Sequence, residues 1–157
     1  QGSTSDRISY EELLLEFIRI YITQTFKEPY KAIVLQKGSP GYKGLPADDR
    51  GKADYANYHY KNELIQHFIN EESILPLIKG LNSDMDILIQ DIMDEHQQLH
   101  QYFQTISDQD ELSDHLDRLG KVLEAHVRKE ERQLFPLIQD HCGEETLKLI
   151  KRALSFH

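Results

Sequence analysis

The sequence predicts an all-α protein, an antiparallel up-and-down four-helix bundle with a long loop after the first helix and a short C-terminal helix. Two observations predict this fold. Apolar residues recur at the spacing of three and four positions that is typical of an amphipathic helix, and the connections between the later segments are short, as between antiparallel neighbours of a bundle. Strand signals are absent, and the 157 residues fit a single domain, which we place at residues 5–157.

The first helix is expected to begin at Ser9-Tyr10-Glu11-Glu12, a capping box in which the serine and the last glutamate accept hydrogen bonds from each other's backbone amides. A monomer has difficulty hiding a helix that is apolar on nearly all sides, so this helix is a candidate contact for a homo-oligomer. Its apolar residues are Leu13, Leu14, Leu15, Phe17, Ile18, Ile20, Tyr21 and Ile22. Pro29 interrupts the pattern, and the glycine and proline residues between 38 and 51 predict a long surface loop.

Three long helices and one short helix follow. The second helix is expected over about residues 54–78, the third over about 84–106 with Ser83 as its cap, the fourth over about 114–140, and the short C-terminal helix over 144–156. Gly143 is a natural stop between the last two. This order leaves short connections everywhere except after the first helix.

On each of the three later long helices, the inward-facing stripe contains two residues of metal-ligand type, four positions apart. The pairs are His67 and Glu71, His96 and His100, and His126 and Glu130. Residues four apart project from one face of a helix, so each pair can bind a common ion. In antiparallel helices, two positions lie level when the turn falls midway between them. The midpoints fall near residues 83–84 and 113, where turns are expected, so the three pairs should share one level of the bundle.

A bound cation is the simplest partner for these residues. A buried ionised carboxylate without a partner is costly, and none of the 18 Lys+Arg falls on the inward stripes. Neutral imidazoles with carboxylates suit iron, manganese or zinc better than calcium, magnesium or copper(I). The alternative is that the polar residues pair with each other, or face solvent because the helical phase differs from the one assumed.

The composition limits the partners and the compartment. With 27 Asp+Glu, the net charge of −9 would repel nucleic acid and anionic membranes, so neither is an expected partner. No apolar run approaches the roughly 18–20 residues that span a bilayer, and no signal-type segment is recognised. The single cysteine, Cys142, cannot form an internal disulfide, so we expect a reducing, cytoplasmic location.

The metal-ligand motifs resemble those of the hemerythrin-like (HHE cation-binding) family, whose members hold a non-heme di-iron site inside a four-helix bundle. The resemblance covers about residues 54–140 and is carried by His67-Phe68-x-x-Glu71-Glu72, His96-x-x-x-His100 and His126-x-x-x-Glu130-Glu131 followed by Leu134-Phe135-Pro136. It implies that His96, His100 and His126 ligate one iron, that His67 belongs to the other, and that Glu71 and Glu130 bridge the two. Glu131 is the alternative bridge, because related proteins place this carboxylate four or five residues after the histidine.

The first helix departs from the family pattern, because no histidine precedes His59. Leu15-Glu16-Phe17-Ile18 resembles the family's first-helix segment, with Phe17 where a histidine ligand is expected. Glu16, Tyr21 and His59 are the candidate substitutes. We therefore expect an asymmetric site that holds one metal tightly and a second weakly or not at all, which means one or two iron ions per chain.

The resemblance implies a non-heme iron-binding protein that binds or senses a small diatomic ligand, either dioxygen or nitric oxide, or that senses iron or redox state. Zinc or manganese would also suit the ligand set. No base that would position a nucleophile stands out, so we assign no catalytic residue and do not favour a hydrolytic enzyme. The alternative is a helical-bundle interaction protein whose metal site is degenerate, structural or absent.

Overall fold

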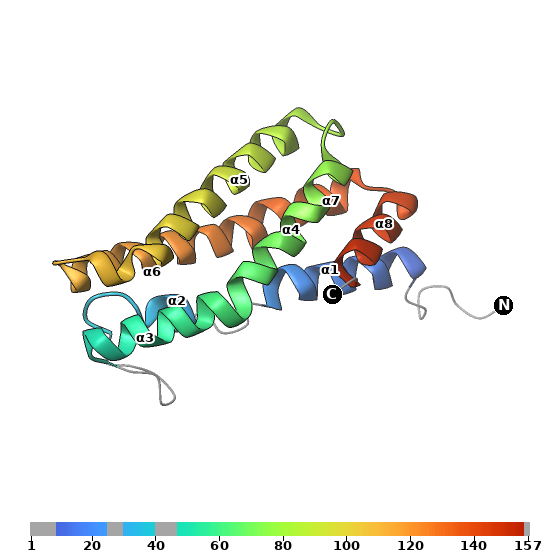
Figure 1. Cartoon of the computed structure of the whole chain (residues 1–157). Helices are drawn as coiled ribbons and strands as arrows, with labels where there is room; N and C mark the ends of the chain where they lie inside the picture. The colour runs from blue at the N-terminus through green and yellow to red at the C-terminus, as the bar shows by residue number, and fades with distance from the viewer. Residues whose placement is uncertain (1–8, 25–29, 40–46, 156–157) are drawn as a thin grey trace.

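The protein is all-α in the part of the chain that the structure describes. The computed structural model describes residues 9–24, 30–39 and 47–155, and these ranges contain helices and connections without a strand (Figure 1). The elements are α1 (Tyr10–Gln24), α2 (Tyr30–Ile33), α3 (Asp49–His59), η2 (Tyr60–Leu64), α4 (Ile65–Ile78), α5 (Ser83–Gln104), η3 (Ile106–Asp108), α6 (Leu112–Lys129), η4 (Glu130–Leu134), α7 (Phe135–His141) and α8 (Glu144–Ser155). The predicted all-α class is confirmed.

The long helices alternate in direction along the chain. In Figure 1, the path reverses between α1 and the rod formed by α3, η2 and α4, again at α5, and again at the rod formed by α6, η4 and α7. Neighbours in the sequence pack together, as α4 with α5 and α5 with α6, and α8 closes one end by packing on α1 and α4. This alternating arrangement is the antiparallel bundle that the short connections predict.

Helix starts are set by side-chain caps, one of which differs from the prediction. At α1 the predicted capping box is confirmed, because the Glu12 amide donates to Ser9 Oγ at 3.1 Å and the Ser9 amide donates to Glu12 Oε1 at 3.4 Å. At α5 the predicted cap Ser83 is wrong. Asn82 is the cap, since its Oδ1 accepts from the amides of Asp84 and Met85 at 2.9 and 3.1 Å.

The rod formed by α3, η2 and α4 begins at Asp49, earlier than the predicted start at about residue 54. Asp48 caps α3 by accepting a hydrogen bond from the Gly51 amide at 2.9 Å, so residues 49–53 are helical rather than loop. The glycine and proline residues predicted that the loop extends to residue 51. The helix begins earlier because the Asp48 cap outweighs the low helix propensity of Gly51. Pro29 and most of the predicted glycine- and proline-rich loop, residues 40–46, lie outside the described residues.

Two of the described elements are π-helical turns inside the rods, and neither is predicted by the apolar periodicity. The turn η2 joins α3 to α4, and η4 joins α6 to α7. Each continues the rod without a break, since the flanking residues His59, Ile65, Lys129 and Phe135 keep right-handed helical dihedral angles. Such turns are frequent at functional sites. The first residue of η4 is Glu130, a predicted metal ligand.

The core is divided into two apolar clusters with a polar layer between them. The α8-side core contains Leu14, Ile18, Ile22, Ile74, Ile78, Met85, Ile92, Leu134, Ile138, Leu147, Ile150 and Leu154 with their neighbours. The α3-side core contains Ala53, Leu64, Phe68, Leu99, Phe103, Leu116, Leu119, Leu123 and Val127 with theirs. On the rods, Phe68 and Ile74 flank Glu71, Ile92 and Leu99 flank His96, and Val127 and Leu134 flank Glu130. Polar ligand-type residues from three rods therefore meet at one level, as the midpoint argument predicts.

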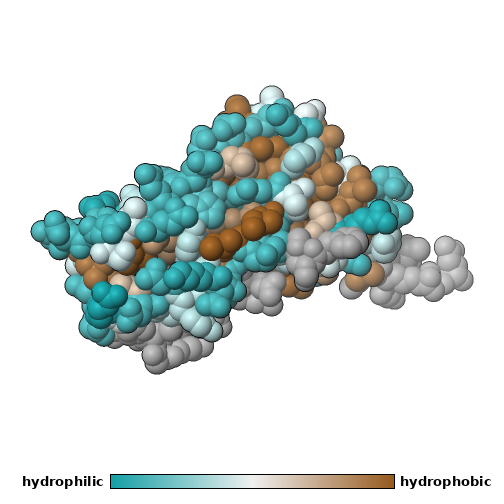
Figure 2. All heavy atoms as spheres, viewed as in Figure 1, coloured by the Kyte–Doolittle hydropathy of each residue, from teal (hydrophilic) through white to brown (hydrophobic). Residues whose placement is uncertain are grey.

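The outer surface is hydrophilic over most of the face shown in Figure 2, with hydrophobic residues gathered toward the half that carries α4, α7 and α8. On α1, Leu14, Ile18 and Ile22 are buried, whereas Leu13 and Ile20 are 53% and 37% exposed. Among the described residues, no helix combines the length and apolar character needed to cross a membrane.

Candidate metal centre

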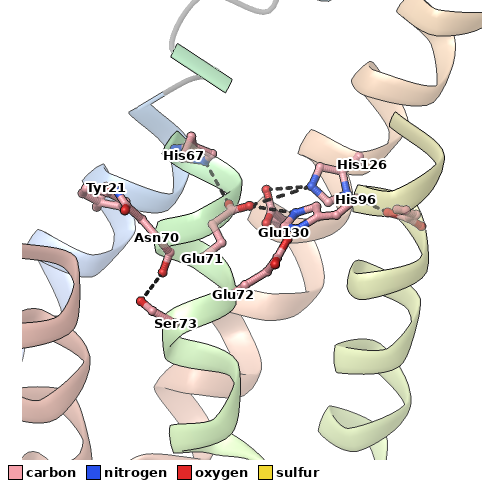
Figure 3. Close-up of polar contacts among 10 residues, drawn as sticks. Tyr21, His67, Asn70, Glu71, Glu72, Ser73, His96, His126 and Glu130 are labelled. Atoms are coloured by element: carbon pink, nitrogen blue, oxygen red, sulfur yellow. Dashed lines mark hydrogen bonds and ion pairs between the residues drawn. The ribbon is translucent and has the colours of Figure 1, made fainter. Parts of the chain in front are cut away.

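Four side chains of the polar layer converge on one point inside the bundle. Glu71 comes from α4, His96 from α5, His126 from α6 and Glu130 from the first position of η4, and all four are buried (Figure 3). Each offers one ligand-type atom, and these atoms lie within 4.8 Å of one another. The amphipathic stripes place them there, because each residue occupies a position that faces the core of its rod.

Glu71 lies at the centre of the contacts. Its Oε1 is 3.0 Å from His96 Nε2 and 4.0 Å from His126 Nε2, and its Oε2 is 2.9 Å from Nε2 of His67. Glu130 Oε1 lies 3.4 Å from His126 Nε2 without a hydrogen bond. One carboxylate therefore contacts histidines from three rods.

Three buried polar atoms of this group have no hydrogen-bond partner. They are His126 Nε2 and both carboxylate oxygens of Glu130. Leaving a buried donor or acceptor unsatisfied costs about 1–3 kcal/mol, and more for a charged group, so unpaired buried atoms in a native fold call for an explanation. A cation bound between these atoms would satisfy all three.

The pKa values of three of these residues, Glu130, Glu71 and His126, are shifted by burial and by the charges of their neighbours. Burial raises the pKa of Glu130 well above the ordinary carboxyl value, and the neighbouring charge of Glu71 raises it further. For Glu71, burial also acts to raise the pKa, but attraction to His67 and hydrogen bonds within the cluster hold it well below the ordinary value. Burial opposes the charging of His126, yet attraction to Glu71 and Glu95, together with the hydrogen bond from Nδ1 to Glu95, raises its pKa. The layer thus carries a central carboxylate that attracts cationic groups.

The remaining predicted ligand on α4, His67, lies on the other side of Glu71. Its ring stacks on Tyr21 of α1, with centroids 5.8 Å apart and planes 11° apart. The Tyr21 hydroxyl accepts a hydrogen bond from Asn70 Nδ2, and Asn70 Oδ1 accepts from Gln66 at 2.8 Å. Of the first-helix substitutes, Tyr21 therefore contacts His67. Phe17, which stands where the family pattern has a histidine, packs against the α8-side core under the ammonium group of Lys151.

His100 is not brought into the four-residue group. Its Nδ1 is 2.5 Å from the Tyr60 hydroxyl, and it borders a surface groove of about 770 Å³ that is also lined by Tyr60 and by glutamines of α5. Burial lowers the pKa of His100. Phe68 separates it from the cluster, since this ring stacks on His96 at 4.4 Å and meets His100 edge-on at 5.4 Å.

The sequence of the chain also matches a known protein family. A family profile described as the hemerythrin HHE cation binding domain matches residues 35–138, with a second, overlapping match over residues 88–153. The chain belongs to this family. The resemblance seen in the motifs is confirmed. Comparisons with curated proteins and with solved structures find no match.

The other predicted substitutes lie apart from the centre of this HHE domain. Glu16 is exposed and forms an ion pair with Arg19. His59 is buried in α3, where its Nδ1 lies 3.0 Å from Glu63 Oε1 and its ring stacks on Tyr55. Glu131, the alternative bridge, is exposed, so the carboxylate that points inward is the one four residues after His126. The ligand roles of all these residues stay predictions.

Two further carboxylates contact the histidines: Glu72, which the sequence motif already placed beside Glu71 and for which a supporting or solvated role is expected, and Glu95, which was not singled out from the sequence. Glu72 Oε2 lies 2.7 Å from His96 Nδ1, and Glu95 Oε1 lies 2.7 Å from His126 Nδ1. Glu95 also pairs with Lys129. The available signal was adjacency, since Glu72 follows Glu71 and Glu95 precedes His96. Adjacency alone does not decide the contact, because Glu131 follows Glu130 and is exposed.

Proposed function

We propose that this HHE domain holds one iron ion between Glu71, His96, His126 and Glu130, and that the ion serves to bind or sense a small diatomic ligand such as dioxygen or nitric oxide, or to sense iron or redox state. The single observation that supports this most strongly is the set of unpaired buried atoms on His126 and Glu130. Two imidazoles and two carboxylates suit iron, with manganese or zinc as alternatives.

The donor set fits a bound cation. In the absence of one, the fold buries a carboxylate whose pKa is strongly raised next to a carboxylate whose pKa is strongly lowered, an arrangement that a divalent charge would stabilise. A bound iron would supply redox chemistry and affinity for small diatomic molecules. Four protein ligands would leave coordination positions for such a molecule, because non-heme iron sites with few protein ligands keep open positions.

The surrounding residues keep the site dry. Phe68 stacks on His96 and meets His126 edge-on with centroids 6.0 Å apart, and the two apolar cores lie on either side of the layer. Exclusion of water strengthens the electrostatic interactions of the carboxylates and protects a bound small molecule from side reactions. The chain's own contribution is to orient the imidazoles and to hold the carboxylates in this apolar setting.

A reconstitution experiment tests this proposal. Metal-free protein is titrated with ferrous iron under anaerobic conditions, and the optical spectrum is followed on addition of nitric oxide and, separately, of dioxygen. We expect one tightly bound iron per chain and a spectral change on gas addition that is absent from His126→Ala. Protein that folds but binds no iron contradicts the proposal. Iron-loaded protein whose spectrum responds to neither gas contradicts binding of a diatomic ligand and favours sensing of iron or redox state.

The alternative function, an interaction bundle with a structural or absent metal, has one observation in its favour. Leu13 and Ile20 of α1 remain 53% and 37% exposed beside the buried side of that helix. Self-association that buries the exposed face of α1 with Leu13 and Ile20 would be detected by sedimentation of the metal-free protein at increasing concentration. Tight self-association without any bound metal in protein purified from iron-supplemented cells would favour the alternative.

A further inference from the structure

Each histidine of the four-residue group is held by a carboxylate from the preceding rod. His96 on α5 contacts Glu72 of α4, and His126 on α6 contacts Glu95 of α5, in both cases through Nδ1 at 2.7 Å. In both rings the opposite nitrogen, Nε2, faces the centre of the group. The same arrangement thus occurs twice, between two different pairs of helices.

These contacts determine which ring nitrogen carries the proton. A carboxylate can only accept a hydrogen bond, so Nδ1 must carry the hydrogen in both rings. In His126, whose Nε2 has no hydrogen-bond partner, this leaves the lone pair of the neutral ring on Nε2, the nitrogen that faces the cluster. His96 Nε2 lies 3.0 Å from Glu71 Oε1, so the His96 ring contacts a carboxylate at each of its two nitrogens. Glu95 therefore selects the tautomer of His126 that can ligate a metal, and Glu72 fixes the orientation of the His96 ring.

The two carboxylates are held in place to different degrees. Glu95 has a second partner, Lys129, which lies on the same helix as His126 and one turn beyond it, and the Glu95 side chain is 21% exposed. Glu72 has a more open position, with its side chain 34% exposed. Partial exposure screens a charge and lets a side chain rotate, so Glu95 should hold its histidine more firmly than Glu72 does.

We propose that Glu72 and Glu95 are positioning residues that orient the His96 and His126 rings with Nε2 directed toward a metal ion, and that Glu95, anchored by Lys129, has the larger effect. The proposal deepens the proposed function and rests on it for its consequences in metal binding. The part of the proposal that concerns the protonated ring nitrogen can be tested in the metal-free protein. Replacing partners of this kind typically weakens metal binding by about tenfold to a hundredfold.

Two measurements on the full chain test the proposal. Affinity for zinc, used as a spectroscopically silent probe, is measured by chelator competition for Glu95→Gln, Glu72→Gln and the control Glu124→Gln. The control removes a partly buried carboxylate of α6 that pairs with Arg128 and Gln36 rather than with a histidine. Long-range proton–nitrogen NMR correlations then report the tautomers in metal-free wild type, Glu95→Leu and Glu72→Leu.

We expect Glu95→Gln to lose about tenfold to a hundredfold in affinity, Glu72→Gln to lose less, and Glu124→Gln to match wild type. In metal-free protein, His126 should carry its proton on Nδ1 and should lose this preference in Glu95→Leu, while unfolding midpoints by urea show that the variants are folded. Unchanged affinity in Glu95→Gln together with an unchanged tautomer in Glu95→Leu overturns the proposal. If wild type binds no metal, the proposed function fails, and the tautomer measurement still decides this inference.

Discussion

The two His-x-x-x-Glu-Glu motifs of this chain, which begin at His67 and His126, meet in one polar layer and form different contacts there. On α4, His67 Nε2 is hydrogen-bonded to Glu71 Oε2 at 2.9 Å. At the junction of α6 and η4, His126 Nε2 and Glu130 Oε1 are 3.4 Å apart, and neither atom has a hydrogen-bond partner. The same spacing therefore gives a satisfied pair in one rod and an unsatisfied pair in the other.

The surroundings of the two histidines explain the difference. His67 stacks on Tyr21, whose hydroxyl is engaged by Asn70, so its side of Glu71 is filled by an aromatic pair and an amide. His126 faces His96, Glu71 and Glu130, and its outer nitrogen is held by Glu95. The comparison indicates that the His126–Glu130 pair, whose facing donor atoms have no other partners, is the better candidate to hold a metal ion.

The largest loss of metal affinity is expected from a substitution in the His126–Glu130 pair. His126→Ala removes one of four predicted ligands and one of two imidazoles, so metal affinity should fall by more than about a hundredfold, beyond the loss that removal of a supporting partner causes. Chelator competition measures the change, and circular dichroism checks that the helices persist. Wild-type affinity in a folded His126→Ala would show that the ion lies elsewhere.

The next effect separates metal binding from stability. The pKa of Glu130 is raised in the folded state, so this group's favourable contribution to metal-free stability is complete below its ordinary value of 4.5 and declines as pH rises through the raised value. Glu130→Gln cannot ionise, so at pH 7.5 it should stabilise the metal-free protein by about 1–3 kcal/mol while weakening metal binding.

Urea unfolding of metal-free wild type and Glu130→Gln at pH 5 and pH 7.5 measures this difference. The gain in stability from the substitution should be larger at pH 7.5. An equal gain at both values would mean that Glu130 does not change ionisation in that range, and a loss of stability at pH 7.5 would mean that its carboxylate is already compensated without metal.

A smaller effect on metal binding is expected on the satisfied side. His67→Ala removes a hydrogen bond to Glu71 but none of the four converging ligands, so affinity should fall by less than about tenfold, the equivalent of roughly 1.4 kcal/mol, with the stoichiometry unchanged. Tyr21→Phe is the matched variant that keeps the stacked ring. Halving of the metal content in His67→Ala would instead reveal a second metal on this side.

A substitution away from the layer should change stability and leave metal binding as it is. A Cβ at Gly120 of α6 would lie 2.6 Å from the Ala32 carbonyl oxygen in α2 and 3.1 Å from Leu35 Cβ just after it, so Gly120→Ala must displace the end of α2 and the residues that follow. Overpacking of this kind costs about 1–3 kcal/mol. Urea unfolding should show that loss, and chelator competition should return the wild-type affinity. Reduced affinity would mean that the layer depends on the α3-side core as a whole.

Much of the fold and part of the site could be predicted from the sequence, because both follow from helical periodicity. The stripes placed Glu71, His96, His126 and Glu130 at one level, and the structure brings these four together. Periodicity could not predict the turns η2 and η4, since a π-helical turn depends on tertiary packing rather than on spacing.

His100 shows the limit of spacing as evidence. It lies four residues after His96 on the same helix, and the structure pairs it with Tyr60, from a turn 40 residues earlier in the chain. Glu95 illustrates the converse, because its contact with His126 depends on how α5 and α6 face each other. Contacts between rods decide these roles, and a single sequence does not specify them.

The most direct test of the account is the number of iron ions bound by the wild-type chain. Anaerobic titration with ferrous iron, followed by elemental analysis after desalting, measures it. The account predicts one iron per chain that is retained by His67→Ala and lost from His126→Ala. Two equally retained ions per chain, or one ion lost from His67→Ala and kept by His126→Ala, would contradict it.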